Sequence, residues 1–512
     1  MITTLEHPVE VVRWLRAQGA RALHCDSRRV RPGDAFIAWP GATQDGRRHV
    51  AAALRAGAVA CLVEREGCEG FGFDDPRIAA VGGLKAATGL IASEFHDQPS
   101  AALDVVAITG TNGKTSTGWW TAQWLAALGD PAALAGTLGL GVPGQALEPT
   151  GLTTPDPVLW QATLRRWADT GIQAGVVEAS SIGLEEGRLN ATRIRSAVFS
   201  NLTQDHLDYH GSMEAYWRAK RALFDWPGLR VAVVNIDDPH GAALAAELRP
   251  RAEAGALDLW TLSVTGQPAR LGAQGWALTE TGLRFEVVER GDDGSTGAPQ
   301  PLQLPLVGDY NRYNLLSALA VVRAHGHALA DALRAAGALT PVPGRMQSAW
   351  GDDASGQPLV LVDYCHTPDA VEKALQALRP LAARRGGRLC CVVGCGGDRD
   401  AGKRPLMAAA AEQQADTLVL TSDNPRSEDP LHILAQMQAG LKQPGQVVVE
   451  PDRAAAIAAT VAHAGARDVV LLAGKGHEDY QEIAGVKQPF SDLEQGRRAL
   501  LAWRERAGEG RA

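Results

Sequence analysis

Residues 105–116, Val-Val-Ala-Ile-Thr-Gly-Thr-Asn-Gly-Lys-Thr-Ser, join an apolar run directly to a glycine-rich turn. Backbone N–H groups in such a turn can face phosphate oxygens, a lysine can reach the outer phosphates, and a threonine can hold Mg²⁺ at the start of the following helix. The complete P-loop pattern has a glycine at the position of Ile108, so the motif alone also permits an ordinary strand–turn–helix. We predict a nucleoside triphosphate site with a loop made of Gly110, Thr111, Asn112, Gly113, Lys114, Thr115 and Ser116.

The length and composition indicate a multidomain protein without a nucleic-acid or membrane signature. A chain of 512 residues can form about three domains, and 45% hydrophobic residues suffice for several cores. The net charge of −8 gives no electrostatic reason to expect nucleic-acid or anionic-membrane binding. Because the first residues do not resemble a signal peptide and no apolar run can span a bilayer, we expect a soluble, cytoplasmic protein. The seven cysteines lack zinc-like spacing and are expected to be reduced, mostly buried thiols.

Short β-rich runs alternate with alanine- and leucine-rich helical stretches, which predicts an α/β fold with mostly parallel sheets. Nearly every predicted strand ends in a polar or glycine cluster, the place where ligands bind in open α/β sheets. A glycine-rich, weakly alternating region between Arg251 and Leu306 predicts additional antiparallel strands. The predicted strands are Val105–Thr109, Gly175–Glu178, Ala197–Asn201, Val231–Asn235, Leu359–Asp363, Leu389–Val393, Thr417–Thr421, Val447–Glu450 and Val469–Leu472.

Residues that interrupt regular structure divide the chain into three predicted domains. They cluster at residues 97–100 and 340–344. The first hundred residues contain short strands, turns and two expected helices, which indicates a small α/β domain. We therefore predict domains over residues 1–100, 101–339 and 340–512.

Two polar clusters follow predicted strands of the central domain. Glu178 precedes Ser180 and Ser181, and residues 201–210 include His206. A carboxylate at the end of a strand could bind Mg²⁺ opposite the phosphate loop, whereas a glutamate taken alone is more often a surface or capping residue. A lone histidine is likewise more often structural.

The helix predicted over residues 213–224 has a lysine near its inward face. Ser212 is its expected N-cap, and Tyr216, Ala219 and Leu223 form an inward stripe. Lys220 lies at the edge of this stripe, where a lysine ordinarily extends its ammonium group toward solvent.

The letters TGTNGKTS of residues 109–116 resemble the ATP loop of the Mur ligase family, amide-forming enzymes that build the peptide of bacterial cell-wall precursors. The resemblance implies a small N-terminal α/β domain that binds UDP, a central P-loop-type domain with a mostly parallel sheet, and a C-terminal Rossmann-like α/β domain. It also implies that ATP phosphorylates a substrate carboxylate and that an amine attacks the acyl phosphate, so positioning and electrostatics supply most of the catalysis.

The resemblance implies a metal site and a modified lysine. It assigns Mg²⁺ to Glu178 and His206, in addition to Thr115 of the phosphate loop. Lys220 follows His206 by the interval at which the family has a carbamylated lysine, so we expect CO₂ to convert Lys220 to N6-carboxylysine, an anion that helps to hold a second Mg²⁺. The expected catalytic set consists of Lys114, Glu178, His206 and Lys220.

Other residues are expected to hold the nucleotide. Residues 308–314 resemble the family's GxxNxxN motif, in which Asn311 would read the base, and helix capping is the alternative role. By the same resemblance Arg345 touches phosphate and Asp363 touches ribose, and closure of the last domain brings both of them to ATP.

The resemblance also implies the acceptor substrate, UDP-MurNAc-L-Ala-D-Glu. Residues 26–34 and 41–46 resemble the UDP-binding segments, although they could also form an ordinary turn network. Ile182 and Glu186 depart from the family, which usually has histidine and glutamine there, and this leaves the detailed dipeptide contacts open. The expected contacts are Ser27, Thr153, Thr154, Ser180, Glu186 and Arg188.

Three strand ends of the last domain resemble the part that selects the amino acid to be added. Residues 423–426, Asp-Asn-Pro-Arg, match the motif of members that add meso-diaminopimelate. Two guanidinium groups for carboxylates and one acid for an ammonium group suit the far end of that doubly zwitterionic molecule. The expected contacts are Arg399, Asp423, Asn424, Pro425, Arg426, Gly474 and Glu478.

Several alternatives remain at this stage. An L-lysine-adding member of the family is the nearest, a folylpolyglutamate synthase-like ligase shares the ATP fold, and a P-loop switch or motor would hydrolyse nucleotide without an amine acceptor. Formation of an amide product separates these possibilities. We expect a monomer that uses ATP and Mg²⁺ and two small-molecule substrates.

Overall fold

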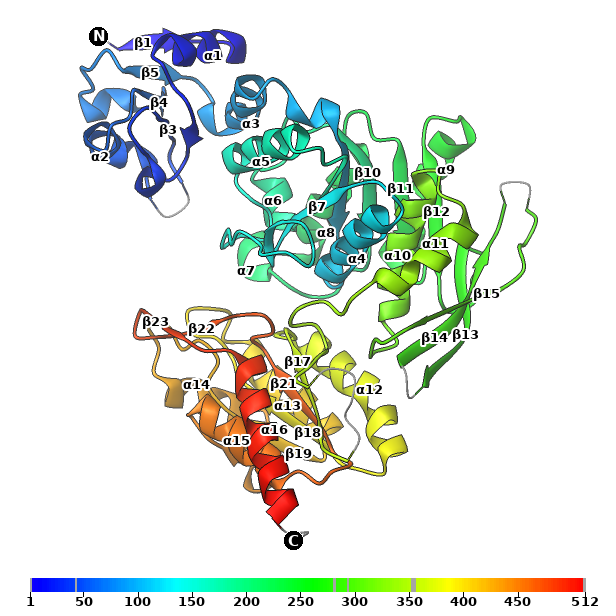
Figure 1. Cartoon of the computed structure of the whole chain (residues 1–512). Coiled ribbons are helices and arrows are strands. Elements are labelled where there is room, and N and C mark those ends of the chain that lie inside the picture. The colour runs from blue at the N-terminus through cyan, green and yellow to red at the C-terminus, as the bar shows by residue number, and fades with distance from the viewer. Residues whose placement is uncertain (1, 42–43, 280–281, 292–293, 351–355, 510–512) are drawn as a thin grey trace.

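The computed structural model describes residues 2–41, 44–279, 282–291, 294–350 and 356–509. Ala42 and Thr43, part of a predicted UDP-binding segment, lie outside the described residues. The chain forms three successive lobes, each with its own main sheet, and each of these sheets lies within one of the three predicted domain ranges (Figure 1). Within the described residues, no helix has the length and apolar character needed to cross a membrane.

The N-terminal lobe contains a five-stranded parallel sheet in the order β1-β5-β4-β3-β2. Three α-helices accompany it, so the expectation of two is wrong. The additional helix is only six residues long, too short to show a clear apolar period. The elements are β1 (Thr3–Leu5), α1 (Pro8–Ala17), β2 (Leu23–His24), β3 (Ala35–Ala38), α2 (Val50–Arg55), β4 (Ala60–Glu64), β5 (Ile78–Val81) and α3 (Leu84–Phe95).

The central lobe contains a ten-stranded sheet in the order β15-β14-β13-β12-β11-β10-β6-β9-β7-β8. Neighbouring strands from β13 through β7 are parallel, whereas β13–β14, β14–β15 and β7–β8 are antiparallel. The additional antiparallel strands predicted between Arg251 and Leu306 are therefore confirmed. The strands are β6 (Asp104–Thr109), β7 (Ala132–Gly136), β8 (Gly139–Gly141), β9 (Ala174–Glu178), β10 (Ile194–Phe199), β11 (Val231–Asn235), β12 (Asp258–Ser263), β13 (Leu271–Thr279), β14 (Gly282–Glu289) and β15 (Gln300–Leu304).

Helices cover both faces of the central sheet, which explains why β6 is apolar at nearly every position. Val106 and Ile108 pack in one core with tryptophans of α4, while Val105 and Ala107 pack in the other with residues of α5, α8 and α9. The helices are α4 (Lys114–Ala127), α5 (Pro157–Asp169), α6 (Ser181–Glu185), α7 (Leu207–His210), α8 (Met213–Arg221), α9 (Pro239–Glu253), α10 (Asn311–Ala324) and α11 (Leu329–Ala335).

The C-terminal lobe contains a six-stranded sheet in the order β16-β17-β21-β18-β19-β20, parallel except for β16. A separate hairpin, β22–β23, precedes the last helix. The elements are β16 (Gln347–Ser348), β17 (Leu359–Asp363), α12 (Pro368–Arg385), β18 (Leu389–Val393), α13 (Lys403–Gln414), β19 (Thr417–Leu420), α14 (Pro430–Gln438), β20 (Val448–Val449), α15 (Arg453–His463), β21 (Val469–Ala473), β22 (Tyr480–Ile483), β23 (Val486–Pro489) and α16 (Asp492–Glu509).

Several element boundaries differ from the sequence prediction. The strand β10 begins and ends earlier than expected, because Ser200 and Asn201 leave the ladder and bond to the phosphate loop. The strand β20 is reduced to two residues. The predicted lysine-containing helix ends at Arg221, after which residues 222–225 form a 3₁₀ turn, and Ser212 caps its start as expected.

The linker between the central and C-terminal lobes is fastened to α4. The Thr340 hydroxyl accepts a hydrogen bond from Gln123 Nε2 at 2.7 Å, and the Thr340 backbone oxygen accepts one from Trp120 Nε1 at 3.0 Å. Gly344 and Met346, a few residues later, have positive φ angles of 64° and 45°. Residues 341–346 therefore form the short connection between this anchor and β16.

Candidate active site

The phosphate loop lies between β6 and α4 and is held by the end of the neighbouring strand β10. Asn201 Oδ1 accepts from the Asn112 backbone N–H at 2.9 Å, and Ser200 Oγ donates to the Asn112 backbone oxygen at 2.6 Å. A Cβ at Gly110 would lie 1.9 Å from Ser200 Oγ, and one at Gly113 would lie 2.3 Å from Asn314 Oδ1. Both positions also have positive φ angles, so the loop requires glycine there.

Lys114 folds back over this loop. Its Nζ donates to the backbone oxygens of Gly110 and Thr111, each at 2.9 Å. Burial lowers the pKa of Lys114, and nearby Glu178 and Asp205 oppose that shift. Arg345, from the interlobe linker, donates to Thr115 Oγ1 at 3.3 Å. Two cationic side chains from different parts of the chain therefore meet at the N-terminus of α4, where phosphate binding is favourable.

Glu178 is buried at the end of β9, directly beside the loop. Its carboxylate accepts hydrogen bonds from Thr115 Oγ1 at 3.0 Å and from the Thr137 backbone N–H at 2.9 Å. A Cβ at Gly136 would lie 2.1 Å from Glu178 Oε1, so the close approach requires glycine. The Thr137 hydroxyl also lies 3.2 Å from that of Thr153, which joins this carboxylate to a predicted dipeptide contact.

Lys220 is buried and does not extend toward solvent. Its Nζ donates to the Gly110 backbone oxygen at 2.8 Å and lies 4.4 Å from the centre of the Tyr216 ring. Burial, together with the nearby Lys114 charge, lowers the pKa of Lys220 well below its usual value. A neutral amine is the form that can react with CO₂, so the environment of Lys220 fits the expected carbamate.

The residues expected to hold Mg²⁺ do not form a complete ligand set by themselves. His206 has a positive φ of 52°, and its Nε2 lies 3.5 Å from a carboxylate oxygen of Asp205. In the described part of the chain, no group of three or more His, Cys, Asp and Glu side chains is arranged to hold a metal. Mg²⁺ is commonly bound by one or two protein oxygens, substrate phosphates and water. Glu178 and Thr115 fit that mode.

A cavity of about 1610 Å³ lies between the central and C-terminal lobes. Its lining includes the phosphate loop from Thr111 to Ser116, together with Glu178, His206, Asn311, Arg345 and Asp363. The structure thus brings most of the predicted nucleotide and metal residues to one space. Lys220 is attached to this loop, because its Nζ donates a hydrogen bond to the Gly110 backbone oxygen.

Asn311 does not cap its helix. It is the first residue of α10, the N-cap position belongs to Tyr310, and no side-chain capping bond is made there. The Asn311 amide instead donates to the Val307 backbone oxygen at 2.7 Å and accepts from Asn314 at 3.0 Å. The capping alternative is therefore wrong, because the Asn311 side-chain amide is hydrogen-bonded to the loop that precedes α10.

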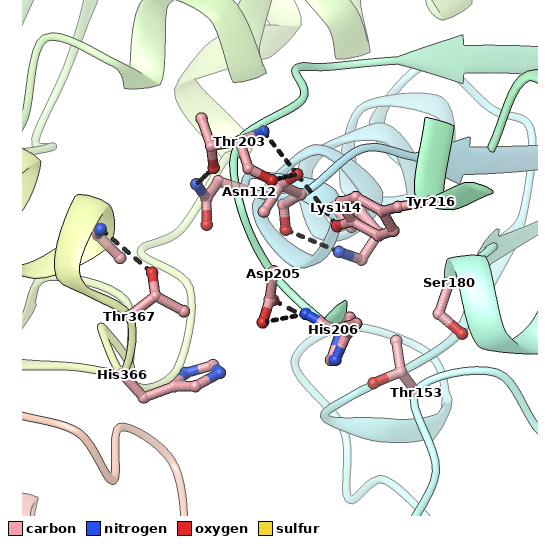
Figure 2. Close-up of polar contacts among 12 residues, drawn as sticks. Asn112, Lys114, Thr153, Ser180, Thr203, Asp205, His206, Tyr216, His366 and Thr367 are labelled. Carbon is pink, nitrogen blue, oxygen red and sulfur yellow. Dashed lines mark hydrogen bonds and ion pairs between the residues drawn. The ribbon is translucent and has the colours of Figure 1, made fainter. Parts of the chain in front are cut away.

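Two further residues of the cavity were not singled out by the sequence. Asp205 and His366 face each other across the space between the lobes (Figure 2). The His366 Nδ1 bonds to the Tyr364 backbone oxygen at 2.8 Å, which leaves the other ring nitrogen for the cavity. Burial lowers the pKa of His366 to about 4. Two features of the sequence could have identified them: Asp205 is adjacent to His206, and His366 lies three residues after Asp363.

The predicted amino-acid residues gather at the ends of β18, β19 and β21. Arg426 Nη1 donates to the Gly397 backbone oxygen at 2.6 Å, and a Cβ at Gly396 would touch both Arg426 and Arg399. Glu478 Oε2 accepts from Asn424 Nδ2 and from Lys475 Nζ, each at 2.8 Å. Two guanidinium groups and one carboxylate therefore border the same group of loops.

A buried ion pair braces these loops from behind. Arg453 donates to both carboxylate oxygens of Asp492, at 2.7 and 2.6 Å, and both side chains are fully buried. The same guanidinium donates to the backbone oxygens of Ser422 at 3.3 Å and Ala473 at 2.9 Å. These residues immediately precede Asp423 and Gly474, so one side chain fixes two of the three strand ends.

The predicted dipeptide residues surround the end of β9. The Thr154 hydroxyl lies 2.8 Å from that of Ser180, and Arg188 Nη1 donates to the Thr154 backbone oxygen at 3.1 Å. Ser180 also caps α6. Figure 2 shows Thr153 and Ser180 on the side of His206 away from the C-terminal lobe. Ser27 lies apart from this group, in a 3₁₀ turn of the N-terminal lobe.

The fold and the cavity define an α/β protein with a phosphate-loop site between two lobes. Three family models match the chain: "Mur ligase family, catalytic domain" over residues 19–85, "Mur ligase middle domain" over residues 108–322 and "Mur ligase, glutamate ligase domain" over residues 344–476.

Similarity to individual proteins extends over nearly the whole chain. The chain is 56% identical over 507 residues to the UDP-N-acetylmuramoyl-L-alanyl-D-glutamate--2,6-diaminopimelate ligase of Acidovorax sp. (strain JS42), covering 98% of this chain and 97% of the relative. It is 48% identical to the Pseudomonas aeruginosa protein of the same name, covering 94% and 95%. A solved structure with that name matches with a TM-score of 0.64 and 36% identity over 95% of each chain. The chain belongs to the Mur ligase family.

Proposed function

We propose that this protein is an ATP-dependent ligase that adds meso-diaminopimelate to UDP-MurNAc-L-Ala-D-Glu, a step in peptidoglycan precursor synthesis. The three similar proteins described above support this function through their names. The proposed domain boundaries are residues 1–100, 101–339 and 340–512, for the UDP substrate, ATP and the amino acid respectively. We further propose that the protein acts in the cytoplasm, as a monomer.

One observation carries the proposal: the amino-acid loops adjoin the acyl-transfer side of the cavity. His477, next to Glu478, lies close enough to the Thr137 backbone that this backbone opposes the lowering of the His477 pKa by burial. The Thr137 side chain in turn bonds to Glu178 at 3.1 Å and lies beside Thr153. Thr137 therefore lies near the predicted diaminopimelate loops and bonds directly to residues of the predicted metal and dipeptide sites.

The proposed mechanism uses these residues for positioning and charge neutralisation. A carboxylate oxygen of the dipeptide attacks the γ-phosphorus of ATP, the bond to the β-phosphate oxygen breaks, and ADP leaves. The amine nitrogen then attacks the acyl carbon, phosphate departs with the electrons of the C–O bond, and the nitrogen loses a proton. Lys114 and Arg345 lie where they can neutralise the phosphate oxygens during the first step.

Mg²⁺ and a carbamate on Lys220 belong to the proposal. Thr115, Glu178 and His206 would hold Mg²⁺ with phosphate oxygens, and the metal would supply additional neutralisation of charge. The burial of Lys220 supports a neutral amine ready for carbamylation. In the same proposal, Asn311 contacts the adenine and Asp363 the ribose.

The amino-acid site is proposed from the charges that line it. Arg399 and Arg426 would bind the distal carboxylate, because guanidinium groups pair bidentately with carboxylates. Glu478 would bind the distal ammonium group, with Asp423, Asn424, Pro425 and Gly474 shaping the pocket. Thr153, Thr154, Ser180, Glu186 and Arg188 would bind the dipeptide, and Ser27 the UDP end.

The test combines the protein with ATP, Mg²⁺, UDP-MurNAc-L-Ala-D-Glu and either meso-diaminopimelate or L-lysine, followed by mass spectrometry of the product. We expect the diaminopimelate-containing tripeptide and stoichiometric ADP. A lysine-containing product would favour the lysine-adding alternative, and glutamate addition to a folate would favour the folylpolyglutamate synthase-like one. Release of phosphate without any amide would indicate a nucleotide switch.

A further inference from the structure

Helix α3 of the N-terminal lobe touches the loop that follows α6 at three successive helical turns. Lys85 pairs with the carboxylate at the start of that loop. A Cβ at Gly89 would lie 2.7 Å from the Asn190 backbone oxygen, and Ser93 Oγ donates to the Ala191 backbone oxygen at 3.4 Å. Positions four residues apart share one helix face. One face of α3 therefore lies against this loop.

The polar end of this contact is a three-residue network. Lys85 Nζ lies 2.5 Å from Glu186 Oε2, and the Tyr209 hydroxyl donates to Glu186 Oε1 at 2.6 Å. Partial burial acts to raise the pKa of Glu186, but the bonds from Lys85 and Tyr209 bring it below its usual value. Lys85 is the cation that contacts the Glu186 carboxylate, and Arg188 is a further positive charge nearby.

The same loop carries Arg188, which bonds to Thr154 in the proposed dipeptide site. If Glu186 lost its pairing with Lys85, its charge in that site would act against a substrate that carries carboxylates and a pyrophosphate. We propose that Lys85 is a positioning residue for the UDP-MurNAc dipeptide, because its ammonium group neutralises Glu186 and fixes the loop against α3. This inference rests on the proposed function.

The test is a double-mutant cycle on Lys85 and Glu186. The KM for UDP-MurNAc-L-Ala-D-Glu is measured in the wild type, Lys85→Met, Glu186→Gln and the double variant, and the Kd of the same compound is measured by calorimetry without ATP. We expect Lys85→Met to raise KM and Kd by about five- to tenfold, with kcat changed by less than about twofold. In the Glu186→Gln background, whatever its own KM, Lys85→Met should raise KM by less than about twofold.

Matched variants distinguish charge neutralisation from a general effect on folding. Lys85→Arg should retain most of the substrate affinity. Arg16→Met removes another cation of the same lobe, one that pairs with Asp97, and should leave KM unchanged. An unchanged Kd in Lys85→Met, or an equal penalty with and without Glu186, would overturn the inference. If the wild type made no tripeptide, the proposed function would fail instead, whereas the calorimetric comparison would still stand.

Discussion

Lys114 makes its hydrogen bonds to the phosphate loop itself, so its removal should affect chemistry more than folding. We expect Lys114→Ala to abolish turnover while the denaturation midpoint and the circular dichroism spectrum stay close to those of the wild type. The reason is that the Lys114 ammonium group lies at the phosphate loop, where it would neutralise the transferring phosphate in the proposed mechanism. Near-normal activity in a folded Lys114→Ala variant would contradict the assignment of the phosphate loop.

Lys220 provides a chemical test of the carbamate. We expect Lys220→Ala to be nearly inactive, and a short carboxylic acid such as acetate to restore part of the activity by supplying the missing anion. Initial rates with increasing acetate measure this rescue. Lys442→Ala, which removes an exposed lysine, should keep full activity and show no response to acetate. An unmodified Lys220 in a high-resolution map, combined with full activity of Lys220→Ala, would rule out the carbamate.

Arg426 should select the amino acid without affecting the nucleotide. A hydrogen bond to a charged group contributes roughly 1.5–3 kcal/mol, and its loss leaves a desolvated carboxylate unpaired, so Arg426→Ala should weaken meso-diaminopimelate binding by about 10²-fold. ATP affinity should hardly change. Calorimetric titrations with both ligands test this, with Arg379→Ala, which removes an arginine paired with Asp416, as the control. Equal weakening of ATP would contradict the proposed role.

At the scale of elements, the Arg453–Asp492 pair joins α15 and α16 to the ends of β19 and β21. Breaking a buried ion pair leaves a charge without a partner, which costs about 3–5 kcal/mol. We therefore expect Asp492→Ala to lower the free energy of unfolding by this amount in urea denaturation and to raise the KM for meso-diaminopimelate. Asp331→Ala, which removes an exposed pair with Arg334, should cost less than about 1 kcal/mol. Similar losses in the free energy of unfolding in both variants would contradict a larger stabilising contribution from the buried Arg453–Asp492 pair.

The sequence predicted the strands and their polar ends because these features are local. An apolar run followed by Gly110 or Glu178 indicates a strand and a ligand position without knowledge of its neighbours. The contacts of Lys85 and Arg453 were not predictable in this way, because each depends on residues far away in the sequence. The burial of Lys220 was implied by the family resemblance and not by the helical period, which placed Lys220 only at the edge of the inward stripe. Periodicity describes one helix, whereas burial also depends on the loop packed over it.

At the scale of the whole molecule, the linker should couple phosphoryl transfer to amide formation. We expect insertion of four Gly and Ser residues between Pro343 and Gly344 to lower tripeptide formation more than phosphate release, because the amino-acid lobe would meet the acyl phosphate less often. Parallel assays of phosphate and tripeptide measure this ratio. A similar insertion at Gly255, in an exposed turn of the central lobe, serves as the control. An unchanged ratio after the linker insertion would show that the linker length does not matter.

The anchoring of Thr340 to α4 tethers the C-terminal lobe, and with it the proposed amino-acid site, close to the central lobe. Only residues 341–346 separate that anchor from β16, and six extended residues span at most about 20 Å. Within such a radius, the effective concentration of one partner at the other is on the order of millimolar or higher, whatever the concentration of the protein in the cell. The amino-acid lobe therefore stays close to the proposed acyl phosphate. The time for which this intermediate is exposed to water is then limited by the local motion of the two lobes and not by diffusion through solution.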